Sequence, residues 1–250
     1  MLKMQIILFS LTALLLSPQL TTISEAEPLS KKQGDIIIDE LRQIRKLLQH
    51  TPEEIPDATD PTPQPEERVS VNIVASPMIG KKEAPLTMVL FTDYQCPFCV
   101  SFETKIFPEI KRKYIDTGKL RFVVQDLPLP SHQHAVKDAE ATYCAEEQGK
   151  YWEFRKRLIL NPETLDAAAL PFHASKIGLD AAKFTTCLKS GRFSEKVKAS
   201  AANATSQNIN GTPTIIIGRK KGAAVEGIKL IGALPFVTID QKIKKLLKEN

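Results

Sequence analysis

The chain has 250 residues, of which 42% are hydrophobic and 25% charged, and it carries a formal net charge of +5. These proportions exclude a wholly disordered chain, a collagen-like repeat and a polytopic membrane protein, and so mild a positive charge predicts no nucleic-acid partner. Four cysteines are too few for a disulfide-dense scaffold but enough for one reactive pair and one structural pair. The length allows one elaborated domain or two small ones.

The first 26 residues have the pattern of a secretory signal peptide. Lys3 precedes an apolar run over residues 6–16, which is shorter than the roughly 20 residues that cross a bilayer as a helix. A polar stretch follows and ends at Ser24-Glu25-Ala26, with small residues at its first and third positions. We predict cleavage after Ala26 and export, to the periplasm or its equivalent; the alternative is an uncleaved membrane anchor.

Residues 27–50 contain a predicted helix that starts near Ser30, which forms a capping-box pattern with Gln33; Asp35 is a second possible N-cap. Its apolar residues follow a heptad spacing: Ile37, Leu41, Ile44 and Leu48. Two interpretations stay open, because two heptads are fewer than a coiled-coil assignment needs. The helix lies on its own domain, or residues 35–48 join copies of the chain into a homo-oligomer.

Residues 51–67 form a predicted linker that separates this helix from the rest of the chain. The segment is acidic and contains five prolines: Pro52, Pro56, Pro61, Pro63 and Pro65. Such a composition cannot form a packed core and favours an extended, semi-rigid chain.

Residues 68–250 carry the predicted fold. Strands are expected at residues 69–74, 86–91 and 120–124, and the continuous apolar run of the second is typical of a buried central strand. An amphipathic helix from Pro97 to about Tyr114 joins the last two, which predicts a parallel strand–helix–strand unit.

The second half begins with a helical block over about residues 131–208. A third apolar strand at residues 214–217 and a partner at 226–231 form a predicted hairpin, and a helix over residues 233–248 closes the chain. The fold class is therefore α/β, with a helical block inserted between the two halves of a sheet domain.

Cys96-Pro97-Phe98-Cys99 lies where a buried strand passes into a helix. The first cysteine of such a motif meets the N–H groups and positive dipole end of the helix, which stabilise a thiolate. Pro97 fits the first helical position because it lacks the N–H that would have no partner there. We therefore predict that Cys96 attacks a disulfide and that Cys99, one turn later, resolves the mixed disulfide.

Other uses of this cysteine pair are disfavoured or stay open. A structural zinc site needs four ligands, and His132 and His134 do not have a common zinc spacing relative to the pair, so no metal site is predicted. We give these histidines a surface or capping role. No cofactor other than the redox-active disulfide is expected. The open alternative is a non-catalytic thiol module that binds copper or another soft metal.

Gly211-Thr212-Pro213-Thr214 directly precedes the third apolar strand. A proline at the start of a strand costs no ladder hydrogen bond, and X-Pro bonds can be cis. A cis-Pro213 loop facing Cys96 would present the Thr212 backbone to an extended substrate segment. A plain trans turn is the alternative.

The motifs TDYQCPFC, CAEEQGKYWEF, FTTCLKSGRF and GTPT occur in this order, and with them the chain resembles the DsbA-like branch of the thioredoxin superfamily from about Val69 onward. These are exported bacterial thiol:disulfide oxidoreductases. The resemblance implies a thioredoxin fold with a helical insertion, Cys96 as nucleophile, Cys99 as resolving cysteine, and Thr212 before cis-Pro213. It also implies secreted client proteins and a membrane redox partner that recycles the enzyme.

The chain departs from the family pattern at several positions. Leu90 stands where many relatives have a buried acid, so Asp93 and Glu103 become the candidates for proton exchange with Cys99. Pro97-Phe98 replaces the Pro-His of the strongly oxidising member, which predicts a less oxidising site. Thr212 is more typical of isomerases and reductases, so oxidase and isomerase activities both stay open.

The remaining predictions concern the second cysteine pair and Phe98. Cys144 and Cys187 lie in the helical block, and export favours a structural disulfide over two buried thiols. Phe98, between the two active-site cysteines, is expected to be exposed and to contact apolar segments of unfolded clients.

Overall fold

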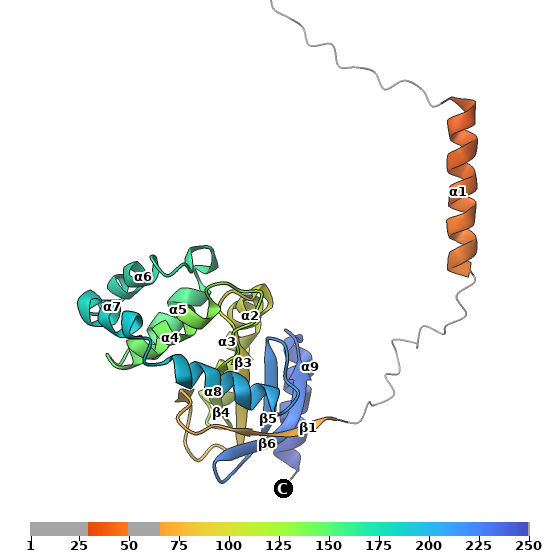
Figure 1. The fold of residues 1–250 in the computed structure, drawn as a ribbon. Coiled ribbons are helices and arrows are strands. Elements are labelled where there is room, and N and C mark those ends of the chain that lie inside the picture. The colour runs from red at the N-terminus through yellow and green to blue at the C-terminus, as the bar shows by residue number, and fades with distance from the viewer. Residues whose placement is uncertain (1–29, 50–65, 250) are drawn as a thin grey trace, which may run out of the picture. The chain divides into compact units, whose positions relative to one another are not determined.

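A computed structural model describes residues 30–49 and 66–249 of the chain (Figure 1). The chain divides into two units, helix α1 (Lys31–Gln49) and the sheet domain that follows, and each is described by itself. Within the described residues, no helix is both long enough and apolar enough to cross a membrane. The predicted signal peptide and residues 51–65 of the predicted linker lie outside the described residues.

Helix α1 begins with the capping box that the sequence predicts. The Ser30 N–H donates to Gln33 Oε1 at 3.0 Å, and the Gln33 N–H donates to Ser30 Oγ at 3.3 Å. Each side chain thus satisfies a backbone donor that has no partner within the first turn. The apolar heptad residues Ile37, Leu41 and Ile44 are all exposed.

The sheet domain contains a six-stranded mixed sheet in the order β1-β6-β5-β3-β4-β2. Its central strands β3 and β4 run parallel and are buried along their whole length, as the apolar run at residues 86–91 predicts. The α/β fold class is confirmed. The strands are β1 (Arg68–Asn72), β2 (Met78–Ile79), β3 (Leu86–Thr92), β4 (Leu120–Asp126), β5 (Thr214–Lys221) and β6 (Ala224–Ile231).

Alternate residues of β3 pack into two hydrophobic cores, one on each face of the sheet. Met88 and Leu90 pack with residues of α9 (Phe236–Lys248) and of the helix that follows β3. Val89 and Phe91 pack on the opposite face, where α8 (Ser194–Thr205) covers the sheet. The period of two along a strand therefore builds a three-layer α/β/α domain around one sheet.

The helix after β3 is continuous from Pro97 to Ile115 but is not a regular α-helix. It alternates between α2 (Pro97–Ser101), the π segment η1 (Phe102–Ile106), α3 (Phe107–Ile110) and the π segment η2 (Lys111–Ile115). Pro108 has no N–H to donate to Thr104 in an α-helix, and a wider π turn accommodates such an interruption.

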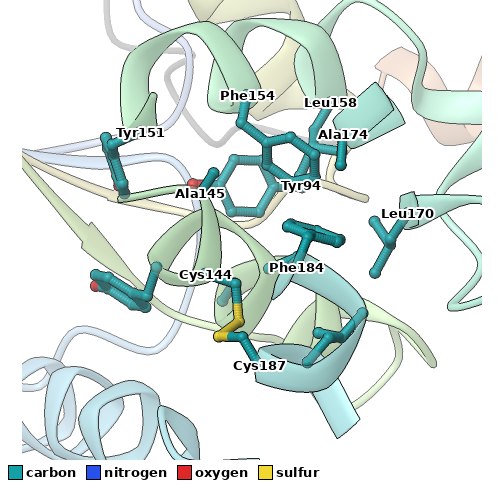
Figure 2. Close-up of a cluster of buried hydrophobic side chains, with 14 of the residues drawn as sticks. Tyr94, Cys144, Ala145, Tyr151, Phe154, Leu158, Leu170, Ala174, Phe184 and Cys187 are labelled. Carbon is teal, nitrogen blue, oxygen red and sulfur yellow. A yellow bond between two sulfur atoms is a disulfide. The ribbon is translucent and has the colours of Figure 1, made fainter. Parts of the chain in front are cut away.

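The helical insertion packs around its own core, on the left of the domain in Figure 1. Tyr94, which precedes the active-site cysteines, extends its ring into this core beside Phe154 (Figure 2). The insertion therefore supports the loop that carries Cys96. Besides α8, its helices are α4 (Ala135–Glu146), α5 (Tyr151–Ile159), α6 (Leu170–Lys176) and α7 (Ala181–Ser190).

The last two residues of the predicted linker contact the sheet domain. Glu66, assigned above to the linker, pairs with Lys242 at 2.6 Å and Lys245 at 3.1 Å, both on α9. The carbonyl of Glu67 accepts the N–H of Lys229 at 2.8 Å. The acidic end of the linker segment is thus held by the basic face of the last helix.

Candidate active site

Cys96 caps the N-terminus of α2. Its extended backbone (φ −75°, ψ 117°) is that of an N-cap residue, and Pro97 occupies the first helical position. The Cys96 N–H donates to the carbonyl of Asp93 at 3.2 Å, which closes a tight turn between β3 and the helix. This placement directs helix N–H groups at the sulfur.

The Cys96 thiol faces the loop before β5. The Thr212–Pro213 peptide bond is cis, and Cys96 Sγ lies 3.4 Å from the Thr212 carbonyl oxygen. The Pro213 carbonyl accepts the N–H of Gly232 at 2.8 Å, so β6 fixes the loop from its other side. The structure therefore brings Cys96 next to Thr212 and Pro213, as the sequence predicts, although Cys96 and Thr212 lie 116 positions apart in the chain.

The two thiols of the motif have opposite acidities. A hydrogen bond from the Cys99 thiol lowers the pKa of Cys96 to about 5, against the effect of burial, and Thr212 and two helix N–H groups add to the lowering. Burial raises the pKa of Cys99, and its bond to the Cys96 sulfur raises it further. Near neutral pH, the site therefore favours a thiolate at Cys96 and a thiol at Cys99.

The acidity of Cys96 gives a direct spectroscopic prediction. The ultraviolet absorbance of the thiolate should rise with pH around a midpoint near 5 in the reduced protein and should be missing in Cys96→Ser. The Thr212 hydroxyl is buried and makes no hydrogen bond within the described residues, so it can donate to a Cys96 thiolate. Thr212→Val removes this donor and should raise the midpoint by about one pH unit. A wild-type midpoint at or above about 8, near that of a free thiol, would contradict the geometry.

The same shift sets the sign of a pH effect on stability. Because the folded pKa of Cys96 lies below the unfolded value of about 8.5, the thiolate stabilises the reduced protein. This contribution is fully present above about pH 8.5 and is lost as the pH falls toward 5.

Two exposed apolar side chains lie at the edge of this site. Phe98 is 65% exposed, as predicted from its place between the cysteines. Ile231, at the end of β6, is also exposed and pairs with Thr214, the residue after Pro213. Apolar surface next to a reactive thiol favours contact with unfolded chains.

Asp93 has a structural role that the sequence does not reveal. One carboxylate oxygen accepts the Gln95 N–H at 2.8 Å, and the other accepts the Leu129 N–H at 2.8 Å. His132 Nδ1 lies 2.8 Å from that second oxygen. Asp93 thus joins the active-site turn to the loop before α4, and His132 supports this link, consistent with a role outside catalysis.

Glu103, the other acid singled out from the sequence, forms an ion pair with Arg155 of α5. Both terminal nitrogens of the guanidinium donate to the carboxylate, one of them at 2.9 Å. The two side chains are each only 4% exposed. Sequence reasoning missed Arg155, because nothing in the chain marks a partner 52 positions away.

Cys144 and Cys187 are joined by a disulfide between α4 and α7, with a Cα–Cα distance of 5.8 Å (Figure 2). The bridge lies in the core of the helical insertion, beside Phe184 and Ala145. Cys96 and Cys99, in contrast, are both thiols. Residues 30–49 and 66–249 contain no cluster of three or more His, Cys, Asp or Glu side chains that could hold a metal ion.

Comparison with known proteins gives the same picture of the sheet domain. Residues 72–230 match the family model described as Thioredoxin. The chain is 31% identical over 164 residues to the disulfide bond formation protein D of Bacillus subtilis, an alignment of 60% of this chain and 70% of that protein. It is also 30% identical over 155 residues to the Na(+)/H(+) antiporter NhaA 3 of Salinispora tropica, covering 62% of this chain. The chain spans about a quarter of the length of such antiporter relatives.

Solved structures share the fold. Alpha-DsbA1 of Wolbachia pipientis superposes with a TM-score of 0.64 at 24% identity, covering 72% of this chain and 94% of that one. Oxidised BdbD of Bacillus subtilis gives a TM-score of 0.63 at 25% identity, covering 74% of this chain and 100% of the other.

Proposed function

Because the chain belongs to the DsbA-like branch of the thioredoxin superfamily, we propose that it is an exported protein thiol:disulfide oxidoreductase that forms, reduces or isomerises disulfides in secreted proteins. One observation carries the proposal. Cys96 sits at a helix N-terminus with a lowered pKa, one turn before a buried thiol that donates to it.

The reaction follows from this pair of acidities. The Cys96 thiolate attacks one sulfur of a client disulfide, forms a mixed disulfide and releases the other client sulfur as a thiolate, which takes up a proton. Cys99 then loses its proton and attacks Cys96, which forms the Cys96–Cys99 disulfide and releases the reduced client. The reverse sequence oxidises a client dithiol, and a membrane redox partner would then restore the Cys96–Cys99 disulfide.

Client recognition is proposed to combine backbone pairing with apolar contact. The cis bond before Pro213 holds the Thr212 backbone next to the Cys96 sulfur, where an extended client strand can pair with it. Phe98 and Ile231 supply exposed apolar surface beside the thiol. This surface favours unfolded clients, whose apolar side chains are accessible.

Helix α1 is proposed to join copies of the chain through a parallel coiled coil. With Ile37, Leu41 and Ile44 in the seam, Glu40 takes a g position and Arg45 the e position five residues later, where they pair between parallel helices. An oligomer would place several Cys96 thiols around one client, an arrangement that suits isomerisation.

Light scattering tests this association. Ile37→Asp with Ile44→Asp places charges in the seam and should convert an oligomer into a monomer, whereas Asp39→Ala on the outer face should leave the mass unchanged. Charge swaps sharpen the test: Glu40→Arg or Arg45→Glu alone should weaken the oligomer, and the two together should restore it. A monomeric wild-type chain would refute the proposal.

Insulin reduction and the reactivation of scrambled ribonuclease test the function itself. Activity in either assay that is lost in Cys96→Ser supports the oxidoreductase, and the stronger assay distinguishes reductase from isomerase. Inactivity in both, together with stoichiometric copper binding, would favour the non-catalytic thiol module instead.

A further inference from the structure

We propose that Arg155, on α5 of the helical insertion, is a positioning residue for Cys99: held by Glu103, its guanidinium stabilises the thiolate that Cys99 carries when the Cys96–Cys99 disulfide forms or breaks. The inference rests on the proposed function, because it concerns the second step of that reaction.

The pair is built as a fixed, water-excluded charge. Glu103 engages both terminal nitrogens of Arg155, and the two side chains are each 4% exposed. The Arg155 Nε–H is buried and has no partner within the part of the chain that the structure describes. A buried donor without a partner is costly, so it favours a negative charge that arises nearby.

Aromatic rings hold the guanidinium in place. It lies 5.9 Å from the ring centroids of both Phe122, on β4, and Trp152, one turn before it on α5. Contacts of this kind fix the plane of the guanidinium. The side chain therefore loses its conformational entropy on folding and not during the reaction. Arg155 therefore needs no rearrangement when charge appears at the active site.

Cys99 is the group that needs this charge. Its thiol is 2% exposed and lies one turn before Glu103 on the helix that carries both. Burial lowers the pKa of Arg155, while negative charge on Tyr94 or on Cys99 raises it. Glu103 follows Cys99 by one turn on the same helix and binds the Arg155 guanidinium, so the guanidinium lies beside the turn that carries Cys99.

The step itself is balanced without any further reactant. In the reductive direction the Cys99 thiol gives its proton to solvent, and the thiolate attacks Cys96 Sγ of the mixed disulfide. The Cys96–Cys99 bond forms, the bond between Cys96 and the client breaks, and the client thiolate takes up a proton. In the oxidative direction Cys99 is the leaving thiolate, so the same charge assists both directions.

The size of the effect follows from thiol chemistry. An opposite charge at this range shifts a pKa by roughly 1 to 3 units, which changes the thiolate fraction of a high-pKa thiol by the same power of ten. The nucleophilicity of a thiolate falls as its pKa falls, with a Brønsted slope of about 0.45. Removing the positive charge therefore slows the attack by Cys99 by a net factor of roughly 4 to 40.

The experiment separates the two steps with oxidised glutathione as the probe. The reduced full chain is mixed with it, quenched in acid at intervals and analysed by mass spectrometry, which resolves the glutathionylated intermediate from its Cys96–Cys99 product. In Arg155→Met with Glu103→Gln, resolution should slow by less than the roughly 4- to 40-fold of an unneutralised charge, because Glu103 offsets part of the charge of Arg155, while formation of the intermediate stays within about twofold of wild type. Arg155→Lys should restore most of the resolution rate.

Two further variants test whether the effect is specific to the charge of Arg155. Arg157→Met removes a cation from the same helix, where it stacks on Phe172, and should leave both steps unchanged. Glu103→Gln alone removes the neutralising carboxylate and should accelerate resolution. Unchanged resolution in folded variants, or equal slowing of both steps, would overturn the role of Arg155. A wild-type chain that forms no intermediate would instead overturn the proposed function.

Discussion

A Cys96→Ser variant is expected to lose thiol–disulfide exchange by more than about 10³-fold, because a serine hydroxyl is not ionised near neutral pH and cannot replace a thiolate nucleophile. The loss should be seen in insulin reduction and in ribonuclease reactivation alike. Ser101→Ala, a small change on the same helix outside the cysteine pair, should retain full activity.

The matching Cys99→Ser variant should behave differently. It retains the nucleophile, so it still attacks disulfides, but it has no thiol to release the product. Mixed disulfides between Cys96 and client proteins should therefore accumulate and be visible by mass spectrometry without reducing agent. If Cys99→Ser turns over at the wild-type rate, or if Cys96→Ser forms the mixed disulfides, the roles of the two cysteines are wrong.

Removing the Cys144–Cys187 disulfide should have the largest effect on stability. The bridge joins residues 43 positions apart, for which chain entropy gives a stabilisation of about 4 kcal/mol. Both cysteines are buried in the insertion core, so Cys144→Ala with Cys187→Ala also leaves small cavities. The free energy of unfolding in urea should fall by about 3–5 kcal/mol, measured with Cys96 and Cys99 reduced in both proteins.

The same bridge should be chemically separable from the active site. Mild reduction should open a Cys96–Cys99 disulfide and leave Cys144–Cys187 intact, because the latter is packed away from solvent. Alkylation of Cys144 and Cys187 as fast as Cys96 in the native protein, or a loss of stability below about 1 kcal/mol, would show that the bridge is not structural.

Much of the fold could be predicted because local signals agree with it. The apolar run at residues 86–91 predicts a strand buried on both faces, which the structure shows in β3. Of the two possible caps in the sequence, Ser30 with Gln33 is the one that starts α1. The Gly211–Thr214 motif permits a cis or a trans proline, the family resemblance implies the cis form, and the structure has the cis bond.

What could not be predicted depends on contacts between distant segments. Arg155 becomes part of the site only when α5 packs against the helix after Cys99, and no periodicity marks it. Asp93 accepts a hydrogen bond from the N–H of Leu129, which lies 36 residues later in the chain. The strand β2 has two residues, which are too few to show an alternation. The apolar spacing of the helix after Cys96 is regular, so it gives no sign of the π segments on either side of the turn that contains Pro108.

The redox equilibrium of the full chain with glutathione tests the central claim most directly. Cys96 and Cys99 should interconvert between dithiol and disulfide as one two-electron couple, while Cys144–Cys187 stays bridged. With the pKa of Cys96 near 5, the potential should lie between those of thioredoxin and the strongly oxidising DsbA, about −270 and −120 mV. A Cys96–Cys99 potential below about −300 mV, typical of structural disulfides, or no response to glutathione at all, would contradict the account.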